Sequence, residues 1–428
     1  MNKLYTTLLT ATLPLWLLRL RRRAKTLPAY RERWDERFGK YQSAPFASHQ
    51  PLTEKTIWIH TVSVGEFLAA RPLIKALLAA YPETTMVITT TTPTGSEQVV
   101  KTFGEQVQHV YIPFDLPWML KRFIKHFQPK ICLIMETELW PNMLAVLKKN
   151  DIPSVFVNAR LSARSAKSYL KIKKTVRRMM QNITQIIVQN KDDGQRFVGL
   201  GLDQNKLTIA GNIKFDMPVP EGIAEKAKDM ANHLGKGDRP MWVVASTHEG
   251  EEALILKSFA NIKKDIPNCL LCLVPRHPDR FDHVYNLCQN AGFKVGRRSQ
   301  ENPLDAECDI AIGDSMGEMM VYYAAADVTF VGGSLIPIGG HNLIEPALLS
   351  LPILTGPNMQ NFLELKNLMV AADAVIICDN ENIVADQVID ILKNPEQAKA
   401  LGQRAEQVAE DNRGALEKHL DKIHGIIR

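Results

Sequence analysis

The sequence predicts two doubly wound α/β domains that follow one another along the chain and face a cleft. Short β-rich runs alternate with helical stretches from residue 56 to about residue 190, and the same alternation starts again at residue 241. Such alternation is typical of parallel sheets that are covered by helices on both faces. The chain has 428 residues, so each domain has room for its own hydrophobic core.

Six short runs predict the strands of the first sheet, at residues 56–62, 86–91, 109–113, 130–135, 154–158 and 185–189. Six more predict the second sheet, at residues 241–246, 269–274, 308–312, 328–331, 352–354 and 374–378. The stretch between the two sets is rich in Pro and Gly, which favours a linker over residues 216–240. We therefore expect domains over residues 26–215 and 241–428, with a last helix that is able to cross back to the first domain.

The amino terminus has a composition of its own. Residues 4–18 carry no charge, and five cations follow them: Arg19, Arg21, Arg22, Arg23 and Lys25. The run is shorter than the roughly 20 apolar residues that a spanning helix needs, so either a short anchor or a helix lying in the membrane interface fits it. A buried helix with a basic end is the alternative. We expect a membrane-associated helix over residues 1–25, with the rest of the chain on the cytoplasmic side because the cations follow the apolar run.

The net charge is distributed unevenly along the chain. Residues 1–40 hold ten Lys/Arg and three Asp/Glu, a balance of +7, whereas the complete chain has +6. The remaining 388 residues therefore sum to −1, and the basic excess belongs to one end. Such a distribution does not favour a nucleic-acid-binding protein.

The six cysteines are scattered, and most lie in apolar runs, which predicts buried, reduced thiols. Cys269 and Cys272 form one C-x-x-C pair, but it lies inside a predicted strand and has no second pair to complete a zinc site. We expect these two thiols to pack in the core. No D-x-D sequence or His/Asp cluster with metal spacing is present, so we expect no metal and no cofactor.

The first candidate site follows the first predicted strand, where Ser63, Gly65 and Glu66 lead into a helical stretch. Two interpretations remain open. Ser63 and Glu66 have the spacing of a capping box, in which the carboxylate only accepts a hydrogen bond from a free backbone amide. Alternatively, Glu66 faces a ligand and takes a proton from a substrate hydroxyl. In either case we expect the helix dipole to lower the pKa of Glu66.

The second candidate site consists of loops that follow strands of the second domain, at residues 275–280, 313–318, 332–334 and 339–347. Glycine allows the backbone to approach a phosphate, and the start of a helix presents free amides. Arg276 and Arg280 add positive charge, and Glu345 is placed to hold a ribose diol. Ordinary turns between strands and helices are the alternative. The recurrence of such loops favours nucleotide binding, although neither a P-loop nor a dinucleotide fingerprint is present.

A basic stretch occupies residues 160–178. It contains eight cations and no acid: Arg160, Arg164, Lys167, Lys171, Lys173, Lys174, Arg177 and Arg178. A solvated helix face is one interpretation. Contact with anionic lipid headgroups or with a phosphorylated acceptor is the other.

Six motifs, taken together and in this order, resemble those of the Kdo transferases of lipopolysaccharide synthesis, where Kdo is 3-deoxy-D-manno-octulosonic acid. They are His60-Thr-Val-Ser-Val-Gly-Glu66, Glu136-Thr-Glu138-Leu-Trp-Pro-Asn142, Asn158-Ala-Arg-Leu-Ser162, Gly211-Asn-Ile-Lys-Phe-Asp216, Pro275-Arg-His-Pro278 and Gly340-His-Asn-Leu-Ile-Glu-Pro346. The resemblance implies a GT-B glycosyltransferase with two Rossmann-like domains. It also implies an inverting transfer of Kdo from CMP-Kdo to lipid IVA, the lipid A precursor, at the cytoplasmic face of the inner membrane.

The resemblance also assigns roles to residues. Glu66 matches the catalytic base of the family, and Glu138 and Lys214 match positions that stabilise the transition state. The CMP-binding segments are matched by Pro275, Arg276, Met316, Gly317, Glu318, Asn342, Leu343, Ile344 and Glu345. Lys214 is expected to contact either the donor phosphate or the Kdo carboxylate, and an ion pair with a nearby Lys is the alternative for Glu138.

The expected partners are thus CMP-Kdo, lipid IVA and the inner-membrane surface, and no nucleic acid. The nearest alternative is a UDP-sugar-dependent GT-B lipid glycosyltransferase or an epimerase. A membrane-surface binding module without catalytic activity is a further one. No motif indicates how many Kdo residues are added.

Overall fold

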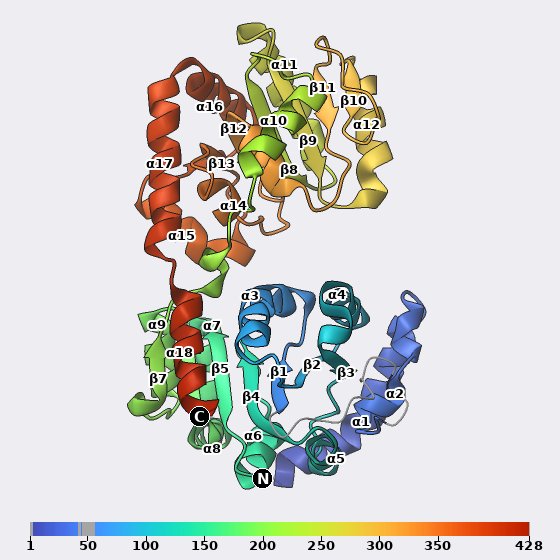
Figure 1. Cartoon of the computed structure of the whole chain (residues 1–428), viewed down its shortest axis with the longest axis vertical. Helices are drawn as coiled ribbons and strands as arrows, with labels where there is room; N and C mark the ends of the chain where they lie inside the picture. The colour runs from blue at the N-terminus through green and yellow to red at the C-terminus, as the bar shows by residue number, and fades with distance from the viewer. Residues whose placement is uncertain (1–2, 42–43, 45–55, 428) are drawn as a thin grey trace. The chain divides into compact units, whose positions relative to one another are not determined.

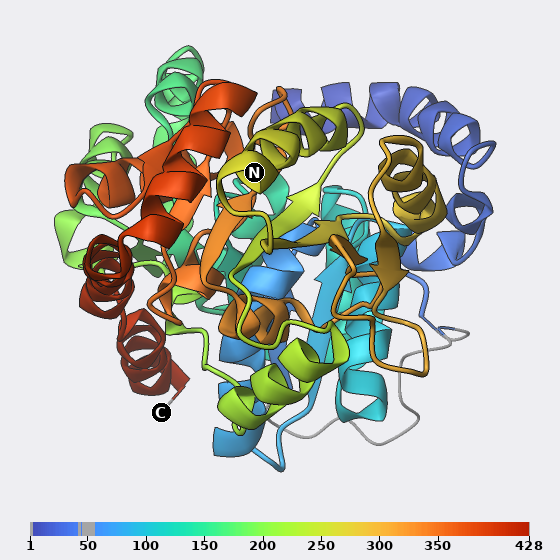
Figure 2. The ribbon, with the colours of Figure 1, turned by 90° about the horizontal axis from the view of Figure 1, so that it is seen from above.

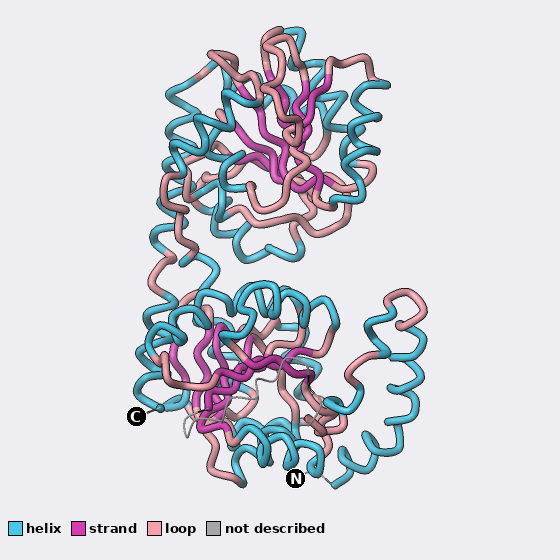
Figure 3. Tube along the Cα trace, turned by 45° about the vertical axis from the view of Figure 1, so that its right-hand side comes forward, coloured by secondary structure: helices cyan, strands magenta, loops and turns pink. Residues whose placement is uncertain are grey.

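The computed structural model describes residues 3–41, 44 and 56–427, and the chain divides into two compact units. Unit 1 comprises residues 1–216 and 413–428, and unit 2 comprises residues 217–412. In each unit the strands lie inside and the helices outside, as Figure 3 shows by colour. Each unit is described separately below.

Unit 1 contains a sheet of seven strands in the order β3-β2-β1-β4-β5-β6-β7, and all of the paired strands run parallel. The strands are β1 (Thr56–His60), β2 (Met86–Thr90), β3 (Gln108–Tyr111), β4 (Pro129–Met135), β5 (Ser154–Ala159), β6 (Gln185–Val188) and β7 (Leu207–Ile209). The two faces of the sheet bury separate cores: Trp58 packs in one and its neighbours Ile57 and Ile59 in the other. This alternation explains why a central parallel strand is apolar at every position.

The helices of unit 1 connect and cover these strands (Figure 1). They are α1 (Lys3–Arg23), η1 (Pro28–Arg31), α2 (Trp34–Arg37), α3 (Val64–Ala80), α4 (Pro93–Phe103), η2 (Gly104–Gln106), α5 (Pro117–Phe127), α6 (Pro141–Lys149), α7 (Ala163–Leu170), α8 (Lys173–Asn182), α9 (Lys191–Gly199), η3 (Gln204–Lys206), η4 (Ile213–Asp216) and α18 (Ala415–Ile427). Polar N-caps define several starts, since the side chains of Ser63, Thr92 and Asn190 each accept a hydrogen bond from the first turn of their helix.

Unit 2 repeats the plan, with strand order β10-β11-β9-β8-β12-β13-β14 and parallel pairing throughout. The strands are β8 (Met241–Thr247), β9 (Leu270–Pro275), β10 (Val295–Arg297), β11 (Ile310–Ile312), β12 (Val328–Val331), β13 (Ile353–Thr355) and β14 (Ile376–Ile377). The helices are α10 (Ile223–His233), α11 (Glu251–Asp265), η5 (Pro278–Arg280), α12 (Phe281–Asn290), α13 (Met319–Ala325), α14 (Ile344–Ala347), η6 (Gln360–Phe362), α15 (Leu363–Ala371), α16 (Glu381–Lys393) and α17 (Pro395–Asp411). Figure 2 shows helices of this unit on both sides of its strands.

The prediction of two parallel α/β domains is confirmed, and each of the twelve predicted strands overlaps an observed one. The sequence did not reveal β7 and β10. Each is three residues long and lies at the edge of its sheet, so its side chains are only partly buried and its apolar pattern is weak.

Residues 217–240, which the composition suggested as a linker, belong to unit 2. They include α10, whose Ala227 and Met230 are buried in a core cluster with residues of β8 and α13. The Pro and Gly residues of this stretch lie outside α10, before and after it. Composition alone could not show that the helix between them packs against the sheet.

The last helix, α18, belongs to unit 1, and Figure 1 shows it in dark red beside β5. The carboxylate of Asp216 accepts hydrogen bonds from the amides of Gly414 and Leu416, both at 2.6 Å, and so caps the start of this helix. His419 is buried and bonds to the backbone of β5. The chain therefore returns to unit 1 after completing unit 2.

The amino-terminal segment forms one helix, α1, in which no described residue is buried. The hydroxyl of Thr6 donates to Oδ1 of Asn142 at 3.0 Å, which ties the beginning of α1 to α6. Leu4, Leu8 and Leu15 remain mostly exposed. In the part of the chain that the structure describes, no helix is both long enough and apolar enough to cross a bilayer. Residues 1 and 2 of the predicted anchor lie outside that part.

All six cysteines are buried as free thiols, as predicted. Cys269 and Cys272 lie in two different core clusters on opposite faces of the second sheet. Burial raises the pKa of Cys269 to about 12 and moves the pKa of Cys272 upward as well. The pair therefore serves packing, because its two side chains point away from each other.

Candidate active site

Each sheet has one point at which the direction of its strand order reverses. In unit 1 this point lies between β1 and β4, and in unit 2 it lies between β8 and β12. In doubly wound sheets the connections leave such neighbouring strands in opposite directions, and ligands typically bind at the carboxyl ends of these strands. We call the two places the first and the second switch point. The predicted site residues lie around them.

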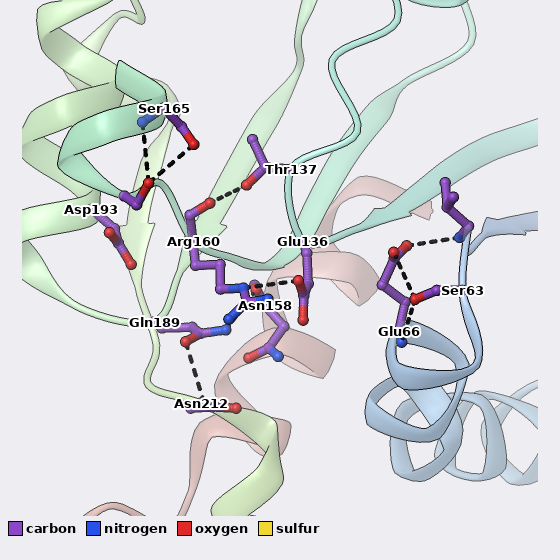
Figure 4. A network of polar contacts seen from close by, with 12 residues as sticks. Ser63, Glu66, Glu136, Thr137, Asn158, Arg160, Ser165, Gln189, Asp193 and Asn212 are labelled. Atoms are coloured by element: carbon purple, nitrogen blue, oxygen red, sulfur yellow. Dashed lines mark hydrogen bonds and ion pairs between the residues drawn. The ribbon is translucent and has the colours of Figure 1, made fainter. Parts of the chain in front are cut away.

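At the first switch point, Glu66 lies in the first turn of α3, directly after β1 (Figure 4). Its Oε2 accepts a hydrogen bond from the amide of Val62 at 2.7 Å, and its Oε1 accepts one from the hydroxyl of Ser63 at 3.1 Å. Ser63 in turn accepts from the amide of Glu66 at 3.3 Å. The capping arrangement is therefore present, and the structure leaves the carboxylate partly exposed at the end of the strand.

The electrostatic expectation for Glu66 was wrong in sign. The pKa of Glu66 is raised to about 7: burial is the largest cause, the carboxylates of Glu138 and Glu136 act in the same direction, and the hydrogen bonds from Val62 and Ser63 only partly oppose the shift. Desolvation and like charge thus outweigh the helix dipole. A carboxylate with a pKa near neutrality is a stronger base than an ordinary one, and it is still ionised in part at pH 7.

Glu138 follows β4, the strand next to β1. Its Oε2 accepts a hydrogen bond from the indole of Trp140 at 2.8 Å, and burial raises its pKa. Among the residues for which side chains are described, no lysine forms an ion pair with it. The structure therefore does not support the ion-pair alternative for Glu138.

Lys214 lies in η4 and is half-buried, and burial lowers its pKa while the nearby Glu136 opposes that shift. Glu136 also pairs with Arg160, whose Nε lies 2.9 Å from its carboxylate (Figure 4). Glu136, the first residue after β4, thus pairs with Arg160 of the basic stretch and also lies near Lys214. Its backbone has a φ of 52°, in the left-handed region, which is uncommon for a residue with a side chain.

Asn158, in β5, connects this strand to η4 and to α18. Its Oδ1 accepts from the amide of Ile213 at 3.1 Å, and its own amide donates to Nε2 of His419 at 2.9 Å. Gln189 donates to its carbonyl at 3.0 Å. The returning helix α18 therefore helps to hold the loop that carries Lys214.

At the second switch point, β9 ends at the buried Pro275, and Arg276 follows with its side chain exposed. The amide of Arg276 donates to the carbonyl of Thr247 at 3.0 Å, which sets the two neighbouring strand ends side by side. His248 comes directly after β8, and its Nε2 lies 2.9 Å from Nε2 of His341. Residues from three strand ends therefore meet here.

The glycine loop at residues 332–334 does not form the phosphate cradle that its composition suggested. The amides of Gly333, Ser334 and Leu335 donate to the carboxylate of Glu251 at 2.7, 3.0 and 3.0 Å. Glu251 is completely buried. A carboxylate of the protein thus occupies the amides that a phosphate would need.

The segment from Asn342 to Glu345 also differs from the expectation. The helix it opens, α14, has only four residues and includes Pro346, so its dipole is small. Leu343 and Ile344 are buried, and their side chains pack into the protein. Asn342 donates to Oε1 of Glu345 at 3.3 Å, and this polar pair is what the segment presents on its partly exposed side.

The third predicted segment precedes α13. Met316 is 64% exposed, which is unusual for a large apolar side chain, and Gly317 has a φ of 87° that favours glycine. Glu318 pairs with Arg298 at 3.2 Å and accepts a hydrogen bond from Ser315. The Met316 side chain is therefore available for contact with a ligand.

Sequence reasoning did not assign four polar residues of these edges: Glu136, Asn158, His248 and Glu251. Glu136 and His248 had a signal, because each is the first polar residue after a buried strand. Asn158 and Glu251 act through buried hydrogen bonds to distant loops, which no local pattern reveals. Within the described residues, no group of His, Cys, Asp and Glu side chains has the arrangement of a metal site.

Solved structures show which class of proteins shares this fold. A glycosyltransferase from Rickettsia africae matches with a TM-score of 0.58 and 14% identity, over 87% of this chain and 99% of that one. The UDP-GlcNAc 2-epimerase of Neisseria meningitidis matches with a TM-score of 0.59 and 14% identity, over 87% and 100%. These matches therefore show a shared two-domain fold, and at these identities they do not separate transferases from epimerases.

Sequence relatives make that distinction. The family model of 3-deoxy-D-manno-octulosonic-acid transferase matches residues 32–217. The 3-deoxy-D-manno-octulosonic acid transferase of Haemophilus influenzae is 42% identical over 98% of this chain and 97% of its own length, and that of Bordetella pertussis is 33% identical over 98% of both. The chain belongs to the Kdo transferase family, and it is a glycosyltransferase.

Proposed function

We propose that the protein moves Kdo from CMP-Kdo to a hydroxyl of lipid IVA, with inversion at the anomeric carbon of the sugar. The observation that carries this proposal is the position of Glu66 at the first switch point of a Kdo transferase, with a pKa of about 7. Family membership supports the Kdo group, and the assignment of donor and acceptor is our own inference.

In this mechanism Glu66 accepts the proton of the attacking hydroxyl as the new C–O bond forms. The amide of Val62 and the hydroxyl of Ser63 hold its two oxygens in place. A positioned base of this kind contributes about 10²–10⁴-fold to a rate. Inversion requires the hydroxyl to attack the face opposite the departing phosphate, so one carboxylate base is sufficient.

Glu138 and Lys214 have electrostatic roles in the proposal. The sugar passes through a state with positive charge at the anomeric carbon, which the carboxylate of Glu138 stabilises, by analogy with glycoside hydrolysis. Lys214 stabilises an anion, either the donor phosphate or the Kdo carboxylate. Burial lowers the pKa of Lys214 below that of an ordinary lysine, while Glu136 favours the charged form of this side chain.

Unit 2 supplies the groups that suit a cytidine monophosphate. Arg276 adds a guanidinium with an exposed side chain, Met316 offers an apolar surface, and Glu345 with Asn342 offers polar atoms for a ribose. These residues follow strands whose carboxyl ends meet at the second switch point or beside it. The proposal requires neither a metal nor a cofactor.

We also propose that α1 and the basic stretch attach the protein to the cytoplasmic face of the inner membrane. In α1, Leu8, Leu15 and Trp16 are exposed, and the last turn carries three arginines. In the basic stretch all eight cations are exposed, and Leu170 and Ile172 are exposed among them. Apolar side chains flanked by cations are suited to a surface of anionic lipid.

The decisive experiment incubates the purified protein with CMP-Kdo and lipid IVA and measures product masses. An increase by one or more Kdo units supports the proposal, and the number of units answers what the sequence leaves open. Turnover of a UDP-sugar alone would instead indicate the alternative donor class.

Membrane attachment is tested separately by sedimentation with vesicles that contain anionic lipid. Deletion of residues 1–25 is expected to release the protein into the supernatant. If the shortened protein still sediments as tightly, attachment depends on the basic stretch and α1 is not the anchor.

A further inference from the structure

The second switch point contains a pair of histidines that the proposed function leaves without a role. His248 follows β8 and His341 lies in the loop after β12, so the pair spans the strands between which the strand order reverses. The two Nε2 atoms are 2.9 Å apart and the ring planes are nearly parallel, at 4° with centroids 5.1 Å apart, so the rings meet edge to edge. Both side chains are partly exposed. The backbone of Gly333 lies close to the pair, since an added Cβ there would lie 3.0 Å from His341 and 3.4 Å from His248.

The short distance between the two nitrogens restricts the protons that the pair can carry. One Nε2 must donate and the other must accept, so in the neutral pair the accepting ring carries its single proton on Nδ1 and the donating ring has a bare Nδ1. A single extra proton goes to that bare Nδ1 and leaves the Nε2 hydrogen bond intact. A second extra proton would place two N–H groups face to face. The pair therefore holds one additional proton and then presents two Nδ1–H donors.

The surroundings oppose this extra proton as long as no anion is bound. Burial lowers the pKa of His341 to about 4, and Arg276, His248 and His277 act in the same direction. Burial also lowers the pKa of His248, and among the charged groups facing it only Glu252 favours protonation. Glu252 is itself buried and paired with Arg280. The charged or titratable groups facing the pair are Arg276, His277 and Arg280 from the loop after β9 and Glu252 from α11.

A bound phosphate monoester would reverse this balance. Its two negative charges attract a proton to the neighbouring imidazoles, and one of its oxygens accepts the Nδ1–H group of one ring. The glycine loop and the one-turn helix α14 give it little help, since Glu251 occupies the loop amides. By linkage, a ligand that favours the protonated pair must itself bind with proton uptake.

We propose that the His248–His341 pair is part of the donor-phosphate site and takes up one proton when a phosphate monoester binds there. This inference rests on the proposed function for the identity of the ligand. During transfer the C–O bond between Kdo and the phosphate breaks, its electron pair remains on the phosphate oxygen, and the phosphate goes from one negative charge to two. The proton comes from solvent and stays on the pair, where it is hydrogen-bonded to the departing phosphate.

The test measures the binding of CMP to the full chain by calorimetry at pH 8, in several buffers of different ionisation enthalpy. At this pH the phosphate monoester is already a dianion because its second pKa is about 6, so the ligand contributes no proton. We expect the observed enthalpy to vary with the buffer in the sense of proton uptake, by a fraction of one proton per CMP. His341→Asn and His248→Asn should abolish this uptake and weaken CMP binding about tenfold, as expected for loss of a charge-assisted hydrogen bond.

Two further variants locate the proton. His283→Asn, a matched change at an exposed position on α12, should bind CMP with unchanged proton uptake. If His277→Asn abolishes the uptake while the two pair variants keep it, the proton belongs to His277 and the inference fails. An enthalpy that is independent of the buffer in the unmodified protein also overturns it, and that outcome needs no variant to fold.

The outcomes separate this inference from the proposed function. CMP that binds the unmodified protein without proton uptake leaves the donor assignment standing and removes the role of the pair. Absence of CMP binding contradicts both. As a second measurement, ¹⁵N spectra of the unmodified protein should show one imidazole Nδ1 gaining a proton when CMP is added, and an unchanged spectrum with CMP bound would contradict the inference.

Discussion

The two switch points occupy the same place in two similar sheets, yet they carry opposite chemistry. The first gathers the carboxylates Glu66, Glu136 and Glu138, and the second gathers imidazoles and guanidinium groups around His248 and His341. Burial is the largest cause of the shift in both, raising the pKa of Glu66 to about 7 and lowering that of His341 to about 4. The comparison teaches that the strand order determines where a site lies in the sheet, and that the side chains at that place determine its charge and chemistry.

The two edges also use their backbone amides differently. At the first switch point, Glu66 accepts one backbone hydrogen bond and retains a partly exposed carboxylate. At the second, the buried Glu251 accepts three and is fully used in fixing a loop. Two glutamates near the starts of their helices thus differ in the number of backbone amides that they bind, and only Glu66 retains the free capacity that the proposed base requires.

The largest effect is expected for Glu66→Gln at the first switch point. The amide oxygen still accepts from Val62, so the cap is kept, but the side chain no longer takes a proton. We expect the transfer rate to fall by about 10²–10⁴-fold, with the dissociation constant for CMP unchanged by calorimetry. Glu97→Gln, an exposed change on α4, is the matched control. An unchanged rate would leave Glu66 with capping alone, and loss of CMP binding together with loss of fold would do the same.

The next largest effect is expected at the other edge. Arg276→Ala should weaken CMP binding by about 1.5–3 kcal/mol, the loss typical of a hydrogen bond to a charged group, while the protein remains folded because the side chain is exposed. Lys264→Ala provides a control, since it removes an exposed cation from the last turn of α11. Calorimetric titration with CMP measures both. An unchanged dissociation constant would remove Arg276 from the donor site.

How much of each switch point can be predicted from the sequence depends on how far apart in the sequence the interacting residues lie. The strands were predictable because a central parallel strand is apolar at every position, as in β1, and the place of Glu66 in the first turn of the helix after that strand was predictable from the same pattern. The pKa of Glu66 was not predictable, since it depends on burial and on Glu138, which lies 72 positions further along the chain. The use of the glycine loop by Glu251 depends likewise on a contact across 82 positions. Local patterns thus locate a site, and distant contacts determine its charge.

A third prediction concerns the contact of α18 with β5 in unit 1. His419 accepts from the amide of Asn158 at 2.9 Å, and its Nδ1 lies 2.7 Å from the carbonyl of Ala415, so the ring must be neutral. His419→Leu leaves the Asn158 amide without its acceptor, which should cost about 1–3 kcal/mol in the free energy of unfolding. His419→Gln retains a donor and an acceptor and should recover part of the loss. Urea unfolding measures both variants, and equal stability of all three proteins would contradict the assigned contact.

The same residue gives a pH dependence of stability. Burial lowers the pKa of His419 from 6.5 in a model peptide to about 4 in the folded protein. Between these values the unfolded chain binds more protons than the folded one, so the contribution is complete above pH 6.5 and is lost as the pH falls toward 4. We expect the unmodified protein to lose more stability than His419→Gln between pH 7.5 and pH 5. An equal loss in both would assign the acid sensitivity to other groups.

The smallest expected effect sharpens the comparison most, because it tests the coupling among the three carboxylates. If Glu66 is the base, kcat/KM should fall as the pH drops through about 7, where that carboxylate becomes protonated. Glu138 carries a charge that raises the pKa of Glu66, so Glu138→Gln should move this acidic limb to lower pH, and Glu136→Gln should move it less because its effect on Glu66 is smaller. Glu83→Gln, at an exposed position after α3, should leave the limb in place. Since Glu138→Gln is also expected to lower the rate itself, the comparison uses profiles normalised to their plateaus. If the acidic limb of the pH profile lies at the same pH in both variants, the carboxylates act independently and burial alone sets the pKa of Glu66.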